Sequence, residues 1–277
     1  MADFAIQAKA QDINFVAKFN SDLHNLMNVL GKTGVDVLAP GTAFKIYKAS
    51  GTLASGTVAE KALIPDSGIA MGDPEITEVT YAKYRNLVSI EDVAKKGYEV
   101  AVGGSNDVML RQIQKSIRAS IFAAIAKGTG TAKAADFQAK VAQAAAFVTK
   151  AFEDEACTPV IFASPDDAYG YLGNHNVTLE SQYGLSYLQN FMGIGNVIID
   201  SNVPNGTVYG TATENLDLVA ASLASIPGMD LTTDETGIVA VHNDADYSHA
   251  SLEVVAYTGV AVLPVFTDRI VKVTAAA

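Results

Sequence analysis

The sequence predicts an α+β protein whose helices and strands come in separate blocks along the chain. Residues 103–127 carry apolar side chains at helical spacing, which is typical of one long helix. Residues 39–92 consist of short runs rich in Thr, Ser, Val and Tyr between glycines and prolines, which is typical of extended chain. Further short strand-like runs fill residues 237–273. We therefore expect one continuous body with two lobes.

The composition is that of a folded, acidic protein. Hydrophobic residues make up 49% of the 277 residues and charged ones 18%, so a sizeable core is expected. The formal net charge of −11 argues against a dedicated nucleic-acid binder, and any contact with nucleic acid should be local. The single cysteine, Cys157, excludes an intrachain disulfide and is interpreted as a small buried residue.

The start of the chain shows no secretory signal, because Asp3, Gln7 and Lys9 interrupt its apolar residues. No run reaches the roughly eighteen uninterrupted apolar residues that would cross a bilayer. We expect a protein that is made in a cytoplasm and has no membrane contact.

Residues 13–30 are expected to form an amphipathic helix that ends at Gly31. Its apolar positions recur at three- and four-residue steps and are Ile13, Val16, Phe19, Leu23, Leu26 and Leu30. Two placements stay open for this helix. It packs on its own domain, or it is an arm that packs on a neighbouring subunit.

Residues 39–92 are expected to form a long two-armed hairpin. Residues 44–48 make one arm, and residues 75–89 make a return arm of roughly 50 Å at about 3.3 Å per residue. Neither arm has a fully apolar face. This pattern suits a ribbon in solvent or on another subunit better than a core strand.

The helix over residues 103–127 is expected to begin at Ser105 as N-cap, with Asp107 near the positive end of the helix dipole. It would be a rod of roughly 33 Å at 1.5 Å per residue. Arg111, Lys115 and Arg118 share a face away from the apolar stripe. That face is either solvated or turned toward an acidic partner.

The middle of the chain predicts an α/β lobe. A second helix is expected over 134–152, and Ser164 followed by Pro165 predicts the start of a third. Strands are expected at 159–163, 196–200 and 207–211, and, in the last third, at 237–241, 251–258, 261–266 and 270–273.

The sequence carries none of the familiar motifs of catalysis, phosphate binding or metal binding. The glycine pairs at 128–130 and 193–195 lack the context of a phosphate loop or a dinucleotide fingerprint. The four histidines, His24, His175, His242 and His249, show no metal-binding spacing, and no serine-hydrolase or cysteine-protease signature occurs. The sequence therefore predicts no catalytic residue, no metal and no cofactor, although an enzyme with an unfamiliar site stays open as an alternative.

The order of elements resembles that of the major capsid proteins of tailed bacteriophages, the Hong Kong 97-type fold. That order is an N-terminal arm, a long two-armed loop, a spine helix, a middle α/β lobe and returning strands. Local phrases also resemble capsid proteins of phages that infect Gram-positive bacteria. They are residues 84–92, 97–98, 110–117, 206–216 and 230–235.

The resemblance implies four parts: an N-terminal arm (1–38), an extended β-hairpin loop (39–92), a peripheral domain (93–133 and 235–277) and an axial domain (134–234). It implies a structural subunit, not an enzyme, that forms hexamers and pentamers of an icosahedral head around double-stranded DNA. It implies a location in the virion, after assembly in the host cytoplasm. The implied partners are other copies of the chain, a scaffolding protein, a portal, weakly and non-specifically bound DNA and, as an open alternative, a decoration protein.

The same resemblance makes the loop an inter-subunit surface, with Lys48, Lys61, Thr77, Tyr81 and Tyr84 as candidate contacts. Some relatives crosslink a loop lysine to an asparagine of a neighbour. Here Asn243 is one candidate acceptor, but the spacing of residues in the sequence identifies no particular pair of lysine and asparagine.

The cations Arg111, Lys115 and Arg118 become candidates for an inner surface facing packaged DNA. Two rival functions stay open: a cellular encapsulin-type shell, and a soluble α/β enzyme with a well-formed pocket.

Overall fold

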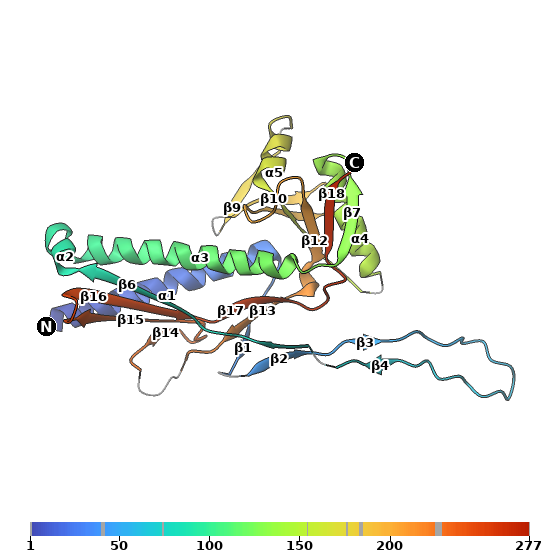
Figure 1. The fold of residues 1–277 in the computed structure, drawn as a ribbon, viewed down its shortest axis with the longest axis horizontal. Helices are drawn as coiled ribbons and strands as arrows, with labels where there is room; N and C mark the ends of the chain where they lie inside the picture. The colour runs from blue at the N-terminus through green and yellow to red at the C-terminus, as the bar shows by residue number, and fades with distance from the viewer. Residues whose placement is uncertain are drawn as a thin grey trace.

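The computed structural model describes residues 2–39, 42–73, 75–153, 155–175, 177–182, 185–224 and 229–276. Figure 1 shows an elongated molecule with long helices along its body, a lobe of strands and helices above them and a hairpin that runs out from one end. The N-terminal helix α1 (Ala2–Leu30) and the spine helix α3 (Gly104–Ile125) lie along the same body.

Helix α1 begins at Ala2 and not at Ile13 as predicted. The added residues are rich in Ala and Gln, which favour helix without contributing an apolar stripe, so the periodicity missed them. Phe19 and Leu26 on this helix are buried in the main core. Within this subunit, α1 thus packs on its own domain, the first of the two predicted placements.

A four-stranded antiparallel sheet runs beside the two helices, in the order β14 (Thr232–Thr233), β15 (Val239–Asp246), β16 (Ser251–Thr258) and β6 (Ala82–Ser89). The predicted return arm 75–89 is therefore wrong as a single element. Its second half, β6, pairs residue for residue with β16. Val88 is buried in the main core, and this packing holds β6 on the body.

The spine helix is preceded by α2 (Ile90–Lys96) and a short π-helix (Glu99–Gly103). Ser89 caps α2 and accepts a hydrogen bond from the Asp92 backbone N–H at 3.2 Å. The prediction that Ser105 is the N-cap of the long helix is wrong. The backbone is already helical from Tyr98, so Ser105 lies inside the helix, where its hydroxyl accepts a hydrogen bond from the Asn86 side chain.

The axial lobe is built on a mixed seven-stranded sheet. Its order is β7 (Gly130–Ala134), β18 (Val271–Ala275), β12 (Val208–Ala212), β8 (Pro159–Ala163), β11 (Gly195–Ile199), β10 (Leu185–Phe191) and β9 (Glu180–Gln182). Helix α4 (Phe137–Ala151) and helix α5 (Pro165–Leu172) complete it. Ser164 caps α5 as predicted, since its hydroxyl accepts from the Asp167 N–H.

Two expectations about this lobe change. The second helix was predicted from residue 134, whereas residues 130–134 form β7 and α4 begins at Phe137. The last strand was predicted in the peripheral segment 235–277, whereas β18 pairs with β7 and β12 in the axial sheet. In both cases the partner strand lies far away in the sequence, so local pattern could not select it.

A three-stranded sheet joins the parts. Its order is β1 (Asp36–Leu38), β13 (Leu216–Ala221) and β17 (Val260–Pro264), and a short 3-10 turn (Thr213–Asn215) leads into β13. One buried apolar cluster includes side chains from α1, α3, the four-stranded sheet and the axial sheet. The two lobes therefore share a core.

The hairpin itself has two short ladders. Strand β2 (Ala43–Ile46) pairs with β5 (Glu75–Glu78), and β3 (Ala49–Ser50) pairs with β4 (Ala70–Met71). The predicted extended loop is confirmed for this part of the chain.

Candidate assembly surfaces

The hairpin runs out from the body (Figure 1), and it exposes large apolar side chains. Leu63 is 93% exposed, Leu53 80% and Ile64 79%, and Tyr47, Ile69, Met71 and Ile76 are also exposed. A two-stranded ribbon of this kind is marginally stable alone in water. Exposed apolar side chains gathered on one projection mark an interaction surface, so the hairpin is suited to lie on another chain.

The two loop lysines occupy different parts of this hairpin. Lys48 is half-buried near its base, with Nζ 5.8 Å from the centroid of the Phe266 ring. Lys61 is exposed farther out, in a left-handed backbone conformation with φ of 66°. Of the predicted contacts, these two lie on the projecting part.

The other three candidates lie closer to the body. The Tyr81 hydroxyl donates to the Ser222 carbonyl at 3.0 Å, and Tyr84 packs half-buried against the main core from β6. Thr77 pairs with Phe44 through the backbone of β5, and its side chain lies outside the described part. An inter-subunit role for the five residues stays a prediction.

Asn243 is engaged within its own subunit. Its side-chain N–H donates to the Asp12 carboxylate, which also accepts from the Thr232 hydroxyl at 3.2 Å. Burial raises the pKa of the Asp12 carboxyl, although both hydrogen bonds act in the opposite direction. This cluster fastens α1 to β14 and β15.

The three cations of the spine helix separate into two environments. Arg111 lines a groove between α1 and α3 of about 440 Å³ together with the acids Asp22 and Asp107. Lys115 and Arg118 line a different pocket, toward the axial sheet. The single cationic face predicted from helical spacing is thus divided between two surfaces.

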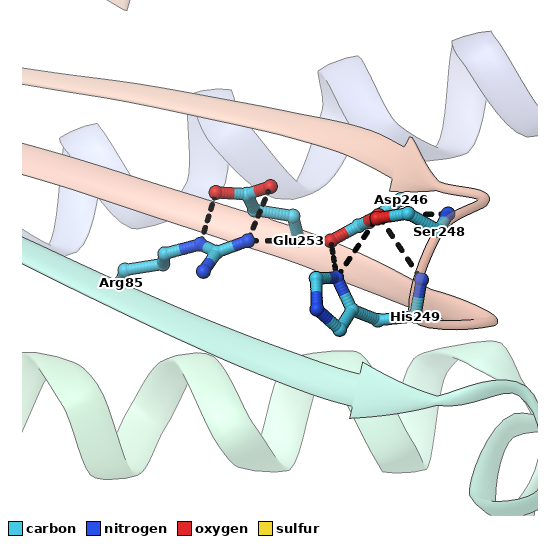
Figure 2. A network of polar contacts seen from close by, with 5 residues as sticks. All are labelled: Arg85, Asp246, Ser248, His249 and Glu253. Carbon is cyan, nitrogen blue, oxygen red and sulfur yellow. Dashed lines mark hydrogen bonds and ion pairs between the residues drawn. The ribbon is translucent and has the colours of Figure 1, made fainter.

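A polar network closes the end of the four-stranded sheet (Figure 2). Arg85 donates from Nη2 to Glu253 at 3.1 Å and to Asp246 at 3.2 Å. Asp246 also accepts from the Ser248 hydroxyl and from His249 Nδ1, at 2.5 and 2.7 Å. These hydrogen bonds lower the pKa of the Asp246 carboxyl to about 2.

This network contains Ser, His and Asp but not the geometry of a nucleophilic triad. The Ser248 hydroxyl and the Asp246 carboxylate both meet Nδ1 of His249, at 2.9 and 2.7 Å. A relay needs the acid on one ring nitrogen and the nucleophile on the other. The network therefore fixes the β15–β16 turn, and it has no activated nucleophile.

Within the described ranges, no three or more His, Cys, Asp or Glu side chains gather so that they could hold a metal ion. Among the helices that the structure describes, none is both long and apolar enough to cross a membrane. Cys157 is half-buried against α4, not fully buried as predicted, and partial burial and nearby Glu214 raise the pKa of its thiol.

No family model and no curated protein matches this sequence. Solved structures do match over nearly the whole chain. The capsid of a native GTA particle aligns with a TM-score of 0.61 at 11% identity, covering 88% of this chain and 88% of its own. A structure of Gordonia phage Cozz aligns at 0.59 and 12% identity, covering 91% and 87%.

The holo-SrpI encapsulin complex from Synechococcus elongatus PCC 7942 aligns at 0.56 and 10% identity, covering 87% of this chain and 84% of its own. The chain thus has the fold of the subunits of capsid shells. More particularly, this is the Hong Kong 97-type capsid fold, with arm, extended loop, spine helix and axial sheet in the predicted order.

Proposed function

We propose that this chain is the major capsid protein of a tailed bacteriophage. In this role it assembles into hexamers and pentamers that close an icosahedral head around double-stranded DNA. The observation that carries the proposal is the projecting hairpin, whose Leu53, Leu63 and Ile64 side chains are almost fully exposed in a single subunit. In a capsid shell this exposed surface can be buried, because each copy around a symmetry axis can lay its hairpin on a neighbouring copy.

Weak contacts suffice for such a shell. Each hairpin contributes a small apolar area, but every subunit donates one hairpin and receives another, so the contacts act together. The proposed partners are other copies of this chain, a scaffolding protein, a portal and, in some heads, a decoration protein. The proposed location is the virion, after assembly in the host cytoplasm.

We propose that the chain is divided into the four parts predicted from the sequence, with two changes. The N-terminal arm is 1–38, and the loop 39–92 contributes its last strand to the body. The peripheral segments 93–133 and 235–277 surround the axial segment 134–234, and their strands β7 and β18 join its sheet. The subunit performs no catalysis in this proposal, in line with the geometry of the Ser248 and His249 contacts.

The first experiment measures the assembly state. The purified chain is examined by sedimentation and electron microscopy with and without a scaffolding protein. Particles in the megadalton range, or rings of five or six subunits, are expected. A stable monomer at every salt concentration, also with scaffold, would overturn the proposal. DNA inside particles from infected cells supports the phage head, whereas an enclosed protein cargo would favour the encapsulin-type alternative.

The second experiment tests the hairpin. The double variant Leu63→Ser, Ile64→Ser should lose particles while its monomer unfolds as the original does, because both side chains are exposed in the monomer. Tyr247→Ser is the matched control, since Tyr247 is 89% exposed but lies in the β15–β16 turn. A ladder of linked chains on denaturing gels would reveal a crosslink through Lys48 or Lys61.

A further inference from the structure

A pocket of about 240 Å³ lies where the spine helix meets the axial sheet. Lys115 and Arg118 reach it from α3, Ser186 from β10, and Ser201 and Asn202 from the turn after β11. These five residues come from three segments far apart in the sequence. The pocket therefore exists only in the folded chain, and it brings two cations together with hydroxyl and amide groups.

The pocket keeps a net positive charge in a chain whose formal net charge is −11. Asp200 is the acidic residue in its lining. One oxygen of that carboxylate, Oδ1, is engaged by the turn, because it accepts from the backbone N–H and the side-chain N–H of Asn202 at 2.8 and 2.7 Å. By formal charge, the lining thus contains two cations and one carboxylate.

The donor types fit a phosphate group. A lysine ammonium offers a point charge with three donors, serine hydroxyls donate to further oxygens, and the positive charge of Arg118 adds to the attraction for an anion. Because these donors enter from a helix, a strand and a turn, they suit a tetrahedral anion better than a planar carboxylate.

We propose that this pocket binds a phosphate group and that, in the particle, the phosphate belongs to the backbone of the enclosed duplex DNA. The assignment of that phosphate to DNA rests on the proposed function. Contacts to backbone phosphate carry no sequence information, so one such pocket in each subunit would hold DNA locally and non-specifically. An acidic subunit needs a local site of this kind, because its overall charge repels DNA.

The test titrates unassembled subunits with a mixed-sequence DNA duplex at several salt concentrations. Lys115→Gln should weaken duplex binding about tenfold at low salt, by loss of a charged hydrogen bond. It should also reduce the slope of log affinity against log salt by about one. Lys115→Arg should restore binding. Arg111→Gln is the matched control, since it removes the same charge from the same helix outside the pocket.

Competition with inorganic phosphate tests whether the pocket binds the duplex through its phosphate groups. At constant ionic strength it should compete with the duplex, and Lys115→Gln should remove the competition. If Lys115→Gln and Arg111→Gln weaken duplex binding equally, the proposed phosphate site is wrong and binding depends on the general positive charge of the helix. Phosphate binding without duplex binding would overturn the assignment to DNA. Electron microscopy of the same samples separates the two proposals, because particles that form normally leave the proposed function intact when the pocket fails.

Discussion

At the scale of single residues, Asn215 connects two sheets. It is buried, and its amide donates to the Phe266 carbonyl at 2.8 Å and the Thr211 hydroxyl at 3.0 Å, while its oxygen accepts from the Phe266 N–H at 2.8 Å. These bonds tie the turn between β12 and β13 to the segment between β17 and β18. Without the side chain, buried backbone groups would lose their partners.

Asn215→Ala should therefore lower the free energy of unfolding by about 3 kcal/mol. Asn205→Ala, in an exposed turn, should change it by less than about 0.5 kcal/mol. Denaturant unfolding of the unassembled subunit measures both. Equal effects of the two variants would show that the Asn215 bonds do not stabilise the junction.

The Asp246 network makes stability depend on pH. The Asp246 carboxyl has its pKa lowered from 3.8 to about 2, first by the Ser248 hydroxyl and then by His249. A carboxyl with a lowered pKa in the folded state stabilises the fold above its unfolded pKa, and this contribution is lost as the pH falls through the folded value. The sensitive window is thus between about pH 4 and pH 2.

Asp246→Asn should reduce the free energy of unfolding at pH 7 and make little difference near pH 2. Asp244→Asn is the control, because the Asp244 side chain is 73% exposed on the same strand. Urea unfolding across the pH range measures the difference. A deficit of the Asp246 variant that is the same at both pH values would contradict a role for its charge.

At the scale of elements, the hairpin depends on a close approach of its two arms. Gly51 has φ of 149°, and a Cβ there would lie 2.7 Å from the Ile69 Cα on the opposite arm. A side chain at this position must push the arms apart. The neighbouring ladder of β3 and β4, which pairs Ser50 with Ala70, would be lost with it.

Gly51→Ala should therefore lower particle yield and speed proteolysis of the hairpin, while unfolding of the body stays unchanged. Gly56→Ala is the matched control, since a Cβ at Gly56 meets no atom within 4 Å. Electron microscopy and limited proteolysis provide the measurements. Normal particles from Gly51→Ala would show that assembly tolerates a widened hairpin.

At the scale of the whole molecule, the lobes share one apolar cluster. Phe19 of α1, Ile113 of α3, Phe162 of the axial sheet and Val254 of the four-stranded sheet all belong to it. The unassembled subunit should therefore unfold in a single cooperative transition, with equal calorimetric and van't Hoff enthalpies. Two separate transitions in calorimetry would contradict a shared core and favour independent domains.

Local pattern was sufficient for the elements that depend on their own sequence. The spacing of Ile113, Ile117 and Ile121 predicted the spine helix, and Ser164 before Pro165 predicted the start of α5, because helical hydrogen bonds and caps join near neighbours. Strands without a strong signal were missed. Residues 216–221 read Leu-Asp-Leu-Val-Ala-Ala and form β13 only because β1 and β17 flank them.

For the candidate surfaces, local pattern predicted a long extended segment, whose two arms lack a fully apolar face, followed by a cationic helix. Only the folded chain shows that β6, with Tyr84, belongs to the body and not to the hairpin. The folded chain also shows that Lys115 and Arg118, but not Arg111, line one pocket with Ser186. The reason is physical: periodicity and capping act within a few residues, whereas strand partners and pocket walls are chosen between segments that only folding brings together.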